Sequence, residues 1–430
     1  MTKSEGNGSP RSASGGPVVR KRRRLSDTVV ALGFVSLFTD MASEMVYTQI
    51  PLFLTQVLGQ GPAVVGLIEG IAESTASLLR VVAGRMSDLS GRRKPLTIAG
   101  YGLGAIAKPL LFLAAGWPMV LALRFLDRVG KGLRTAPRDA LIAEETAPEL
   151  RGRAFGLHRA MDTTGAVLGP LLGVWFLSLF VASTEVQLRS LFLFAGIPGL
   201  LAVLTLIFFV RERDSRQQPE KPELAPSTAA PPLGGAGALA RWRELDPAYR
   251  RFLGIAFLFN LGNSSDAFLI LRAHHFGFDN QMLLWLYAAF NLVEAILGYK
   301  AGSLSDRIGR RPLIIAGYGI FALVYLGFAL VSTNTAFAIW PLFLLYGGYY
   351  TLTQGSQRAF AADYADPSRR GAQIGAYHTV VGLALLPASI IAGVLYQWRQ
   401  AAPFYLGAAT AVLCALLLLS LPRKTIPAAQ

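Results

Sequence analysis

Six ionisable side chains lie at helical spacing within one otherwise apolar stretch of this 430-residue chain. They are Arg124, Asp127, Arg128, Lys131, Arg134 and Arg138. Steps of three and four residues place all six on one face of a helix. Such a face either binds a charged group of a small molecule or is neutralised by acids on neighbouring helices. Arg124, Arg128 and Lys131 are therefore candidates for holding an anionic group of a substrate.

Acids occur on the neighbouring apolar stretches. Asp40 and Glu44 lie one helical turn apart, Glu69 and Glu73 repeat that spacing, and Asp162 lies further along the chain. Eight bases face seven acids over the first five stretches, which favours internal ion pairs. In the alternative interpretation an acid moves between environments: burial favours a neutral carboxyl group and a nearby arginine favours an ionised one. An acid exposed alternately to both could load and release a proton.

The second half carries fewer charges and more hydrogen-bonding side chains. Asp266, Asn291, Tyr346 and Gln357 are its candidates for substrate binding, although a tyrosine-rich helix is also typical of plain packing. The four histidines lack the spacing of a metal-hydrolase motif. The single cysteine, Cys414, excludes a multi-thiolate metal site. We therefore predict no metal, no cofactor and no enzymatic activity.

The composition indicates that these residues are positioned by membrane helices. Hydrophobic residues make up 53% of the chain and charged residues 16%, against about 25% in soluble domains. A bilayer requires about 20 apolar residues per helix, and twelve such spans are found. They begin near Thr28, Ala63, Pro95, Pro118, Ala154, Leu188, Arg250, Met282, Leu313, Phe337, Gly371 and Pro403. The prediction is an all-α polytopic membrane protein in contact with the lipid bilayer.

The basic residues predict the orientation of the spans. Of the 41 Lys and Arg residues, 28 fall on one side of the predicted topology, which places both termini in the cytoplasm. These charges are topological anchors, so the net charge of +15 does not indicate a nucleic-acid partner. The predicted organisation is a disordered basic tail (1–27), a six-helix bundle (28–210), a cytoplasmic linker (211–246), a second six-helix bundle (247–422) and a short cytoplasmic tail (423–430).

An internal repeat relates the two bundles. The segment Gly84-Arg-Met-Ser-Asp88-Leu-Ser-Gly91-Arg92 after span two matches Gly302-Ser-Leu-Ser-Asp306-Arg-Ile-Gly309-Arg310 after span eight. A second pair, beginning at Arg151 and Arg370, repeats at nearly the same offset. The duplicated loop in a 6+6 layout resembles the major facilitator superfamily (MFS) of secondary transporters. The resemblance implies two pseudo-symmetric six-helix bundles that alternate access to a central site.

The resemblance also implies roles for particular residues. The loop motif would form a conformational latch on the cytoplasmic side, made of Gly84, Asp88, Gly91, Arg92, Asp139, Asp306 and Arg310, with Asp139 able to pair with Arg92. Acids on the first span often couple protons in such transporters, so Asp40 and Glu44 are the candidates here. Gly165, Gly169, Pro170 and Gly173 resemble the motif associated with antiporters and export, although Val174 replaces its last glycine.

These observations together predict a monomeric, proton-driven secondary transporter of the bacterial inner membrane. The leading hypothesis is export of a small organic compound, anionic or zwitterionic, by antiport. One alternative is uptake of an anionic metabolite by proton symport, and a lipid translocase is a further one. A membrane enzyme or a receptor on the same fold is disfavoured by the duplicated latch.

Overall fold

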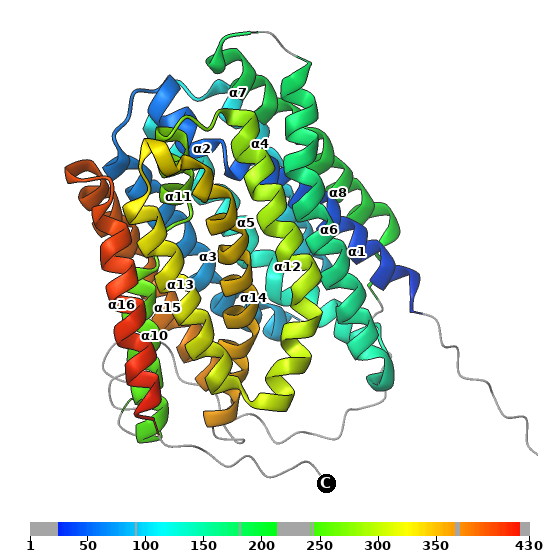
Figure 1. The fold of residues 1–430 in the computed structure, drawn as a ribbon. Coiled ribbons are helices and arrows are strands. Elements are labelled where there is room, and N and C mark those ends of the chain that lie inside the picture. The colour runs from blue at the N-terminus through cyan, green and yellow to red at the C-terminus, as the bar shows by residue number, and fades with distance from the viewer. Residues whose placement is uncertain are drawn as a thin grey trace, which may run out of the picture.

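A computed structural model describes residues 25–90, 93–179, 182–212, 242, 245–365 and 370–421, and over these ranges the chain is built of helices (Figure 1). The first half comprises α1 (Asp27–Tyr47), α2 (Ile50–Leu52), η1 (Phe53–Val57), α3 (Pro62–Ser90), α4 (Lys94–Leu110), η2 (Leu111–Leu113), α5 (Trp117–Glu144), η3 (Pro148–Leu150), α6 (Arg151–Ser178), α7 (Thr184–Phe194) and α8 (Gly196–Phe209). The second half comprises α10 (Pro247–Gly262), α11 (Ala267–His275), α12 (Asn280–Ile308), α13 (Arg310–Leu330), η5 (Thr333–Ala338), α14 (Ile339–Tyr364), α15 (Arg370–Trp398) and α16 (Ala402–Leu419).

Within the described ranges these elements join end to end into twelve rods, as the sequence predicts. Each rod begins within six residues of its predicted start. Ten of the rods contain a stretch long and apolar enough to cross a membrane. The other two are α5, which carries the charged face, and α14, which is rich in tyrosine and glutamine. Most of the predicted linker and both predicted tails lie outside the described residues.

Local sequence signals explain where several helices begin. The Ser26 side chain accepts a hydrogen bond from the Val29 amide and so caps α1. Asp279 accepts from the Met282 amide at 2.7 Å and caps α12. Asp246 does the same for α10. In each case a side-chain oxygen satisfies an amide that has no partner within the helix.

One rod is broken in a way that the sequence analysis did not predict. Span seven consists of α10 and α11, separated at residues 263–266 by a short non-helical segment. Broken helices at membrane depth are tolerated where the freed backbone groups line a site or are buried in protein. The candidate substrate residue Asp266 lies at this break.

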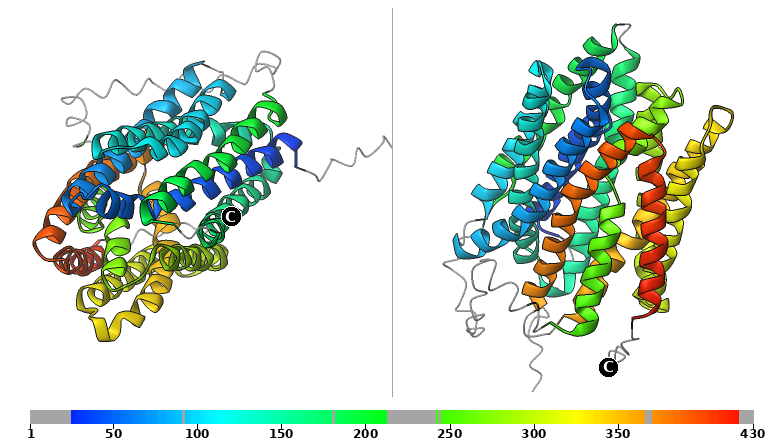
Figure 2. Two further views of the ribbon diagram at one scale, coloured as in Figure 1. Left: turned by 90° about the horizontal axis from the view of Figure 1, so that it is seen from above. Right: turned by 90° about the vertical axis from the view of Figure 1, so that its left-hand side faces the viewer.

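The two halves meet along two helix pairs related by the internal repeat. Helix α3 of the first half packs against α15 of the second, and α6 packs against α12. Figure 2 shows the halves as two groups, with α15 in orange beside the blue helices of the first half. Spans two and eight are equivalent by the repeat, as are spans five and eleven, so the interface is pseudo-symmetric.

Helices α3 and α15 lie closest at one end of the molecule. We call the face where α1 begins and α16 ends the terminal side. A Cβ atom added to Gly393, near the opposite end, would lie 2.8 Å from the Pro62 carbonyl oxygen. One added to Gly375, near the terminal side, would have its nearest neighbour, Val81 Cγ1, at 3.9 Å. The ends of α6 and α12 at the terminal side are also separate at the bottom of Figure 1. The halves therefore close against each other at the end opposite the termini and diverge at the terminal side.

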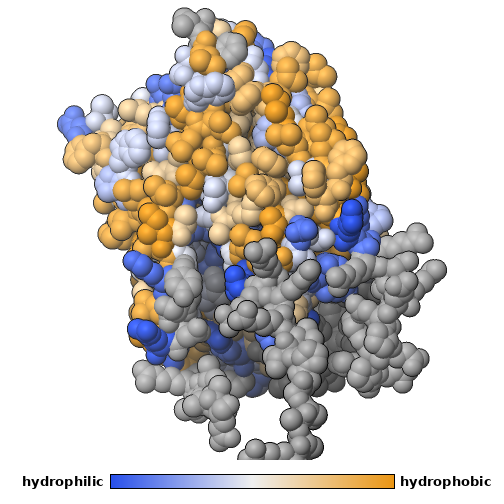
Figure 3. Space-filling model, turned by 90° about the vertical axis from the view of Figure 1, so that its right-hand side faces the viewer, coloured by the Kyte–Doolittle hydropathy of each residue, from blue (hydrophilic) through white to orange (hydrophobic). Residues whose placement is uncertain are grey.

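The outer surface fits a bilayer. Large exposed apolar side chains occur along most of the rods, for example Phe208, Leu330 and Leu416. Figure 3 shows one side of the molecule as a broad apolar face, with polar residues gathered toward the terminal side. The chain is a multi-pass membrane protein.

Candidate functional site

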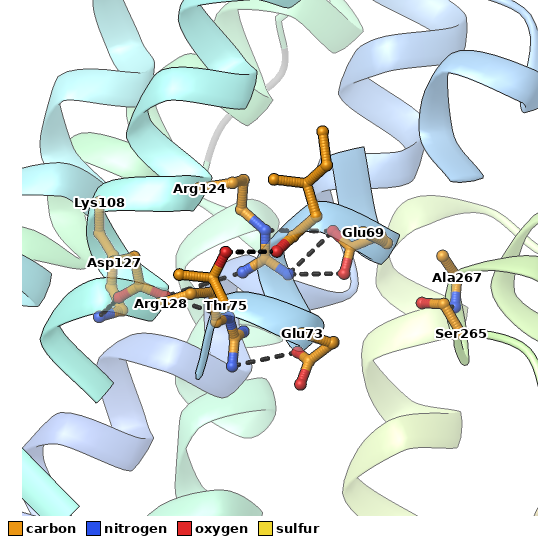
Figure 4. Close-up of polar contacts among 10 residues, drawn as sticks. Glu69, Glu73, Thr75, Lys108, Arg124, Asp127, Arg128, Ser265 and Ala267 are labelled. Atoms are coloured by element: carbon orange, nitrogen blue, oxygen red, sulfur yellow. Dashed lines mark hydrogen bonds and ion pairs between the residues drawn. The ribbon is translucent and has the colours of Figure 1, made fainter. Parts of the chain in front are cut away.

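One end of the charged face on α5 forms a buried ion pair. Arg124 donates to both carboxylate oxygens of Glu69 on α3, with Nε–Oε1 at 3.1 Å and Nη2–Oε2 at 2.6 Å. The Arg124 side chain is 4% exposed and that of Glu69 1% exposed. The two-point geometry is the strongest arrangement of these groups. Figure 4 shows the pair facing Ser265, at the break in span seven of the second half.

Two further ion pairs extend this network. Lys108 Nζ on α4 lies 2.7 Å from Asp127 Oδ1, and Arg128 Nη1 lies 3.2 Å from Glu73 Oε1 (Figure 4). Asp127 also lies between the two guanidinium groups, 3.8 Å from Arg124 and 3.6 Å from Arg128. The ion-pair interpretation therefore applies to Arg124 and Arg128. Their role in substrate binding stays a prediction.

Close helix packing makes these short contacts possible. A Cβ atom added to Gly100 on α4 would lie 2.7 Å from the carbonyl oxygen of Gly130 on α5. Only glycine allows the two backbones to approach so closely. A small cavity between α1, α4 and α5 is lined by Lys108, Arg124, Asp127 and Arg128 of this network.

The lower part of the charged face is arranged differently. Arg134 lies over the Tyr101 ring, with its guanidinium carbon 4.5 Å from the ring centroid, in a cation–π contact. Arg138 pairs with Asp139 at 2.7 Å. Lys131 makes no ion pair within the described part of the chain, although it interacts electrostatically with Asp40, Glu44 and Glu73. Of the three predicted substrate-binding bases, Lys131 is thus the one available to a ligand.

The predicted proton-coupling residues lie near Lys131. Glu44 on α1 makes no ion pair in the described residues, and it is close enough to Lys131 of its own half and to Asp266 and Glu294 of the other half to interact electrostatically. Asp40, one turn earlier on α1, is close enough to Asp162 on α6 to interact with it electrostatically. Glu44 therefore lies near the second half of the protein, and Asp40 lies between α1 and α6.

The predicted residues of the second half separate into two groups. Tyr346 donates to Asp266 at 2.6 Å, and Asn291 donates to the Ala166 carbonyl oxygen of the first half at 2.9 Å. These three side chains face the interface. Gln357 instead bonds to Tyr318 and Tyr377 within the second bundle.

Aromatic rings surround Asp266. Phe290 stacks on Tyr346 at 5.6 Å and meets Tyr350 edge-on at 5.6 Å. Tyr47 of the first half lies 5.8 Å from Tyr287 of the second. The described residues contain no group of three or more ligands that could hold a metal ion. This part of the interface thus combines a carboxylate with an aromatic wall, which suits an organic ligand.

The predicted latch is described in part. Arg310 pairs with Asp363 and donates to the Ala359 carbonyl oxygen, and Gly84 lies against Ala136. Gly91 and Arg92 lie outside the described residues, so the predicted pairing of Arg92 with Asp139 does too, as do the side chains of Asp88 and Asp306. The structure adds an ion pair that the sequence analysis missed, between Arg93 and Glu144 at 2.8 Å.

The antiporter-like glycines of α6 lie at its contacts with α1 and α12. A Cβ atom at Gly169 would lie 2.5 Å from the Met41 carbonyl oxygen, and one at Gly165 would collide with the Leu37 carbonyl oxygen. Gly173 faces Leu284 of α12. Pro170 lies inside α6, where a proline removes one helical hydrogen bond. These residues let α6 approach α1 closely along one face.

The structure also reveals a charged bridge between the halves. Arg159 on α6 pairs with Asp162 in its own helix and with Glu294 on α12. The sequence could not pair Arg159 with Glu294, because the two residues lie in different halves of the chain. Their only signal was the rarity of charge within apolar spans.

Comparison with known proteins places these features in a family. The Major Facilitator Superfamily model matches residues 32–389 and 252–429. An MFS-type transporter of Methanocaldococcus jannaschii, described as uncharacterized, is 35% identical over 92% of this chain and 95% of its own length. The multidrug resistance protein MdtH of Photorhabdus laumondii is 26% identical over 82% of each chain. Among solved structures, a mutant of the nucleoside transporter NupG matches with a TM-score of 0.75 and 14% identity, over 92% of this chain and 100% of that one. The chain therefore belongs to the Major Facilitator Superfamily and is a membrane transporter, not an enzyme.

Proposed function

We propose that the protein is a proton-coupled antiporter that exports a small organic compound from the cytoplasm. The observation that carries this proposal is the position of Glu44, a carboxylate between the halves without an ion pair in the described chain. A carboxylate so placed changes its exposure whenever the halves rearrange, and can bind a proton on one side and release it on the other. Asp40 on the same helix provides a second acid.

The direction of transport is inferred from two supporting facts. The glycines of α6 fit the pattern associated with antiporters, and a relative over most of the chain is named a multidrug resistance protein. The excess of Lys and Arg on one side favours a cytoplasmic position for the termini. The terminal side, where the halves diverge, is then the side from which a compound to be exported would enter.

The free charges at the interface favour a zwitterionic compound. Arg124 and Arg128 are held by acids, which leaves Lys131 in the first half to attract an anionic group. Asp266, which makes no ion pair in the described residues, would attract a cationic group from the second half. Proton symport of an anionic metabolite is the second candidate function, and it is favoured by Lys131 alone.

Transport by purified protein in liposomes tests the proposal. Liposomes under an imposed pH gradient are supplied with an organic cation, an anion, a zwitterion and a neutral compound, while a trapped dye reports internal pH. We expect one class of compound to drive protons across the membrane in the direction opposite to the movement of the compound itself. The variant Glu44→Gln should lose gradient-driven transport but keep exchange of labelled for unlabelled compound, which needs no net proton movement. Glu185→Gln, at an exposed ion pair on α7, is the matched control. Full gradient-driven transport by Glu44→Gln would refute the coupling role.

A further inference from the structure

The closest contact between α1 and α6 surrounds a pair of acids. Gly165 and Gly169 let the backbone of α6 touch that of α1 at Leu37 and Met41. Asp40 lies between those two positions on α1, and Asp162 lies one turn before Gly165 on α6. The antiporter-like glycines thus bring two carboxyl groups together within the membrane.

The geometry of this acid pair suits a shared proton. Ser36, one turn before Asp40 on α1, donates to Asp162 Oδ1 at 2.7 Å, so the face of α1 that carries Asp40 also contacts Asp162. Two carboxyl groups that share a site do not readily ionise together, so one member of such a pair holds a proton. Asp162 already accepts from Ser36 Oγ at 2.7 Å and from Arg159 Nη1 at 3.2 Å. Both of its oxygens therefore have donors, which favours Asp162 as the ionised member and Asp40 as the one that carries the proton.

Arg159 connects the acid pair to the other half of the protein. One of its terminal nitrogens bonds to Asp162, and the other bonds to Glu294 on α12. The Arg159 side chain is 58% exposed, whereas those of Asp162 and Glu294 are 22% and 15% exposed. A single cation at the edge of the interface is thus shared between an acid of each half.

Other charged groups face the pair from the surrounding helices. Asp40 interacts electrostatically with Glu44 on α1 and with Lys131 and Arg134 on α5. Arg138 on α5 acts on Asp162, and His158 on α6 interacts with it. Glu294, on α12, interacts in turn with Arg358 on α14. Arg138 is held by Asp139 and Arg134 by the Tyr101 ring, so Arg159 is the base that bonds to both an acid of the pair and the second half.

We propose that Asp162 is a second proton-coupling residue, which shares one proton with Asp40 and transmits the presence of that proton to the second half through Arg159 and Glu294. The proposal rests on the proposed proton coupling and names the group that links the proton to the movement of the halves. Asp162 and Arg159 act here through α12, and neither needs to touch the substrate.

The coupling step is a single proton transfer. With the proton on Asp40, the acid pair carries one negative charge, and the Arg159 guanidinium group bonds to both Asp162 and Glu294. When Asp40 gives its proton to water, no other covalent bond changes, and the pair carries two negative charges. Two adjacent carboxylates repel unless a cation neutralises them. Arg159 is then drawn onto the pair and away from Glu294, and the bridge between α6 and α12 weakens.

Distances between the halves test this proposal without a known substrate. Spin labels are placed at Phe155 on α6 and Leu304 on α12, both exposed, in a Cys414→Ser background, and the protein is held in lipid nanodiscs. We expect the distance between the labels to change with pH in one sigmoidal step. Asp162→Asn should move the midpoint to lower pH by about one unit or more, because a neutral amide no longer helps to retain the proton on Asp40. Glu294→Gln should abolish the step. Infrared difference spectra should show the protonated carboxyl band that disappears in Asp40→Asn.

Two further variants keep the result interpretable. Asp162→Glu retains the acid and should keep the step, which distinguishes lost chemistry from misfolding. Gln56→Ala removes a contact between the halves, to His274, without removing a charge, and should leave the midpoint unchanged. A wild-type distance that does not vary with pH, or an Asp162→Asn midpoint equal to that of the wild type, would overturn the proposal. Absence of proton-driven transport in liposomes would instead overturn the proposed function, while the distance measurement would still decide whether the pair controls the bridge.

Discussion

Replacement of Glu69 by glutamine should destabilise the first bundle strongly. The change leaves Arg124 as a cation that is 4% exposed and has lost its two-point partner. Removing one member of a buried ion pair costs about 3–5 kcal/mol, because the remaining charge is uncompensated. Asp127, 3.8 Å from Arg124, compensates in part, so we expect the lower limit of that range, about 3 kcal/mol. At about 2–4 °C per kcal/mol for a unit of 150–250 residues, the melting temperature should fall by about 6–12 °C.

The assay is thermal loss of helical circular dichroism in detergent, with three comparison variants. Glu144→Gln breaks the Arg93 pair, in which the Glu144 side chain is 34% exposed, and should cost no more than about 1 kcal/mol. Arg124→Gln alone should also be destabilising. The double variant Glu69→Gln/Arg124→Gln should be more stable than the sum of its two single variants, because it leaves no unpaired charge. A strictly additive double variant, or a Glu69→Gln protein that melts like the wild type, would refute the assignment of Arg124 to structure.

The remaining predictions concern packing and binding. Gly169→Ala should destabilise the protein by about 1–3 kcal/mol, because its methyl group meets the α1 backbone, whereas Gly156→Ala, with open space around it, should be neutral or slightly stabilising in the same melting assay. Gly66→Ala should disfavour the state in which the halves are closed at the end opposite the termini, because its methyl group would collide with α15. Cysteines introduced at that end should then be labelled more by a thiol reagent. Unchanged labelling would contradict this prediction. Tyr346→Phe removes the hydrogen bond to Asp266 and should raise the KM for a substrate several-fold. Lys131→Gln should weaken transport of anionic and zwitterionic compounds but spare cationic ones, and equal loss for all classes would argue against direct binding.

The helices were predictable because their signals are local. Hydropathy placed each start within six residues, and the near-balance of eight bases and seven acids indicated internal pairing. The partners were not predictable, because pairing depends on how each helix is rotated against its neighbours. Arg124 and Lys131 share one helix face, yet one is held by an acid of α3 and the other makes no ion pair in the described residues.

Contacts between the halves also could not be predicted from local sequence. Arg159 and Glu294 are 135 positions apart, and nothing in either stretch of sequence marks the other as its partner. The break in span seven at residues 263–266 was missed for a related reason. A non-helical segment at membrane depth is tolerated only because surrounding protein satisfies it, and that surrounding protein comes from distant parts of the chain.

The charged face of α5 has a consequence for how the protein is made. Each arginine, lysine or aspartate at the middle of a membrane helix opposes insertion by about 3 kcal/mol. Five such residues lie between Arg124 and Arg134, so α5 would not enter a bilayer alone. The chain is synthesised from its N-terminus, and α3 and α4 therefore precede α5 with the partners Glu69, Glu73 and Lys108 already in place. Successful insertion of the fourth span should thus depend on the second and third spans remaining beside the translocon until it emerges.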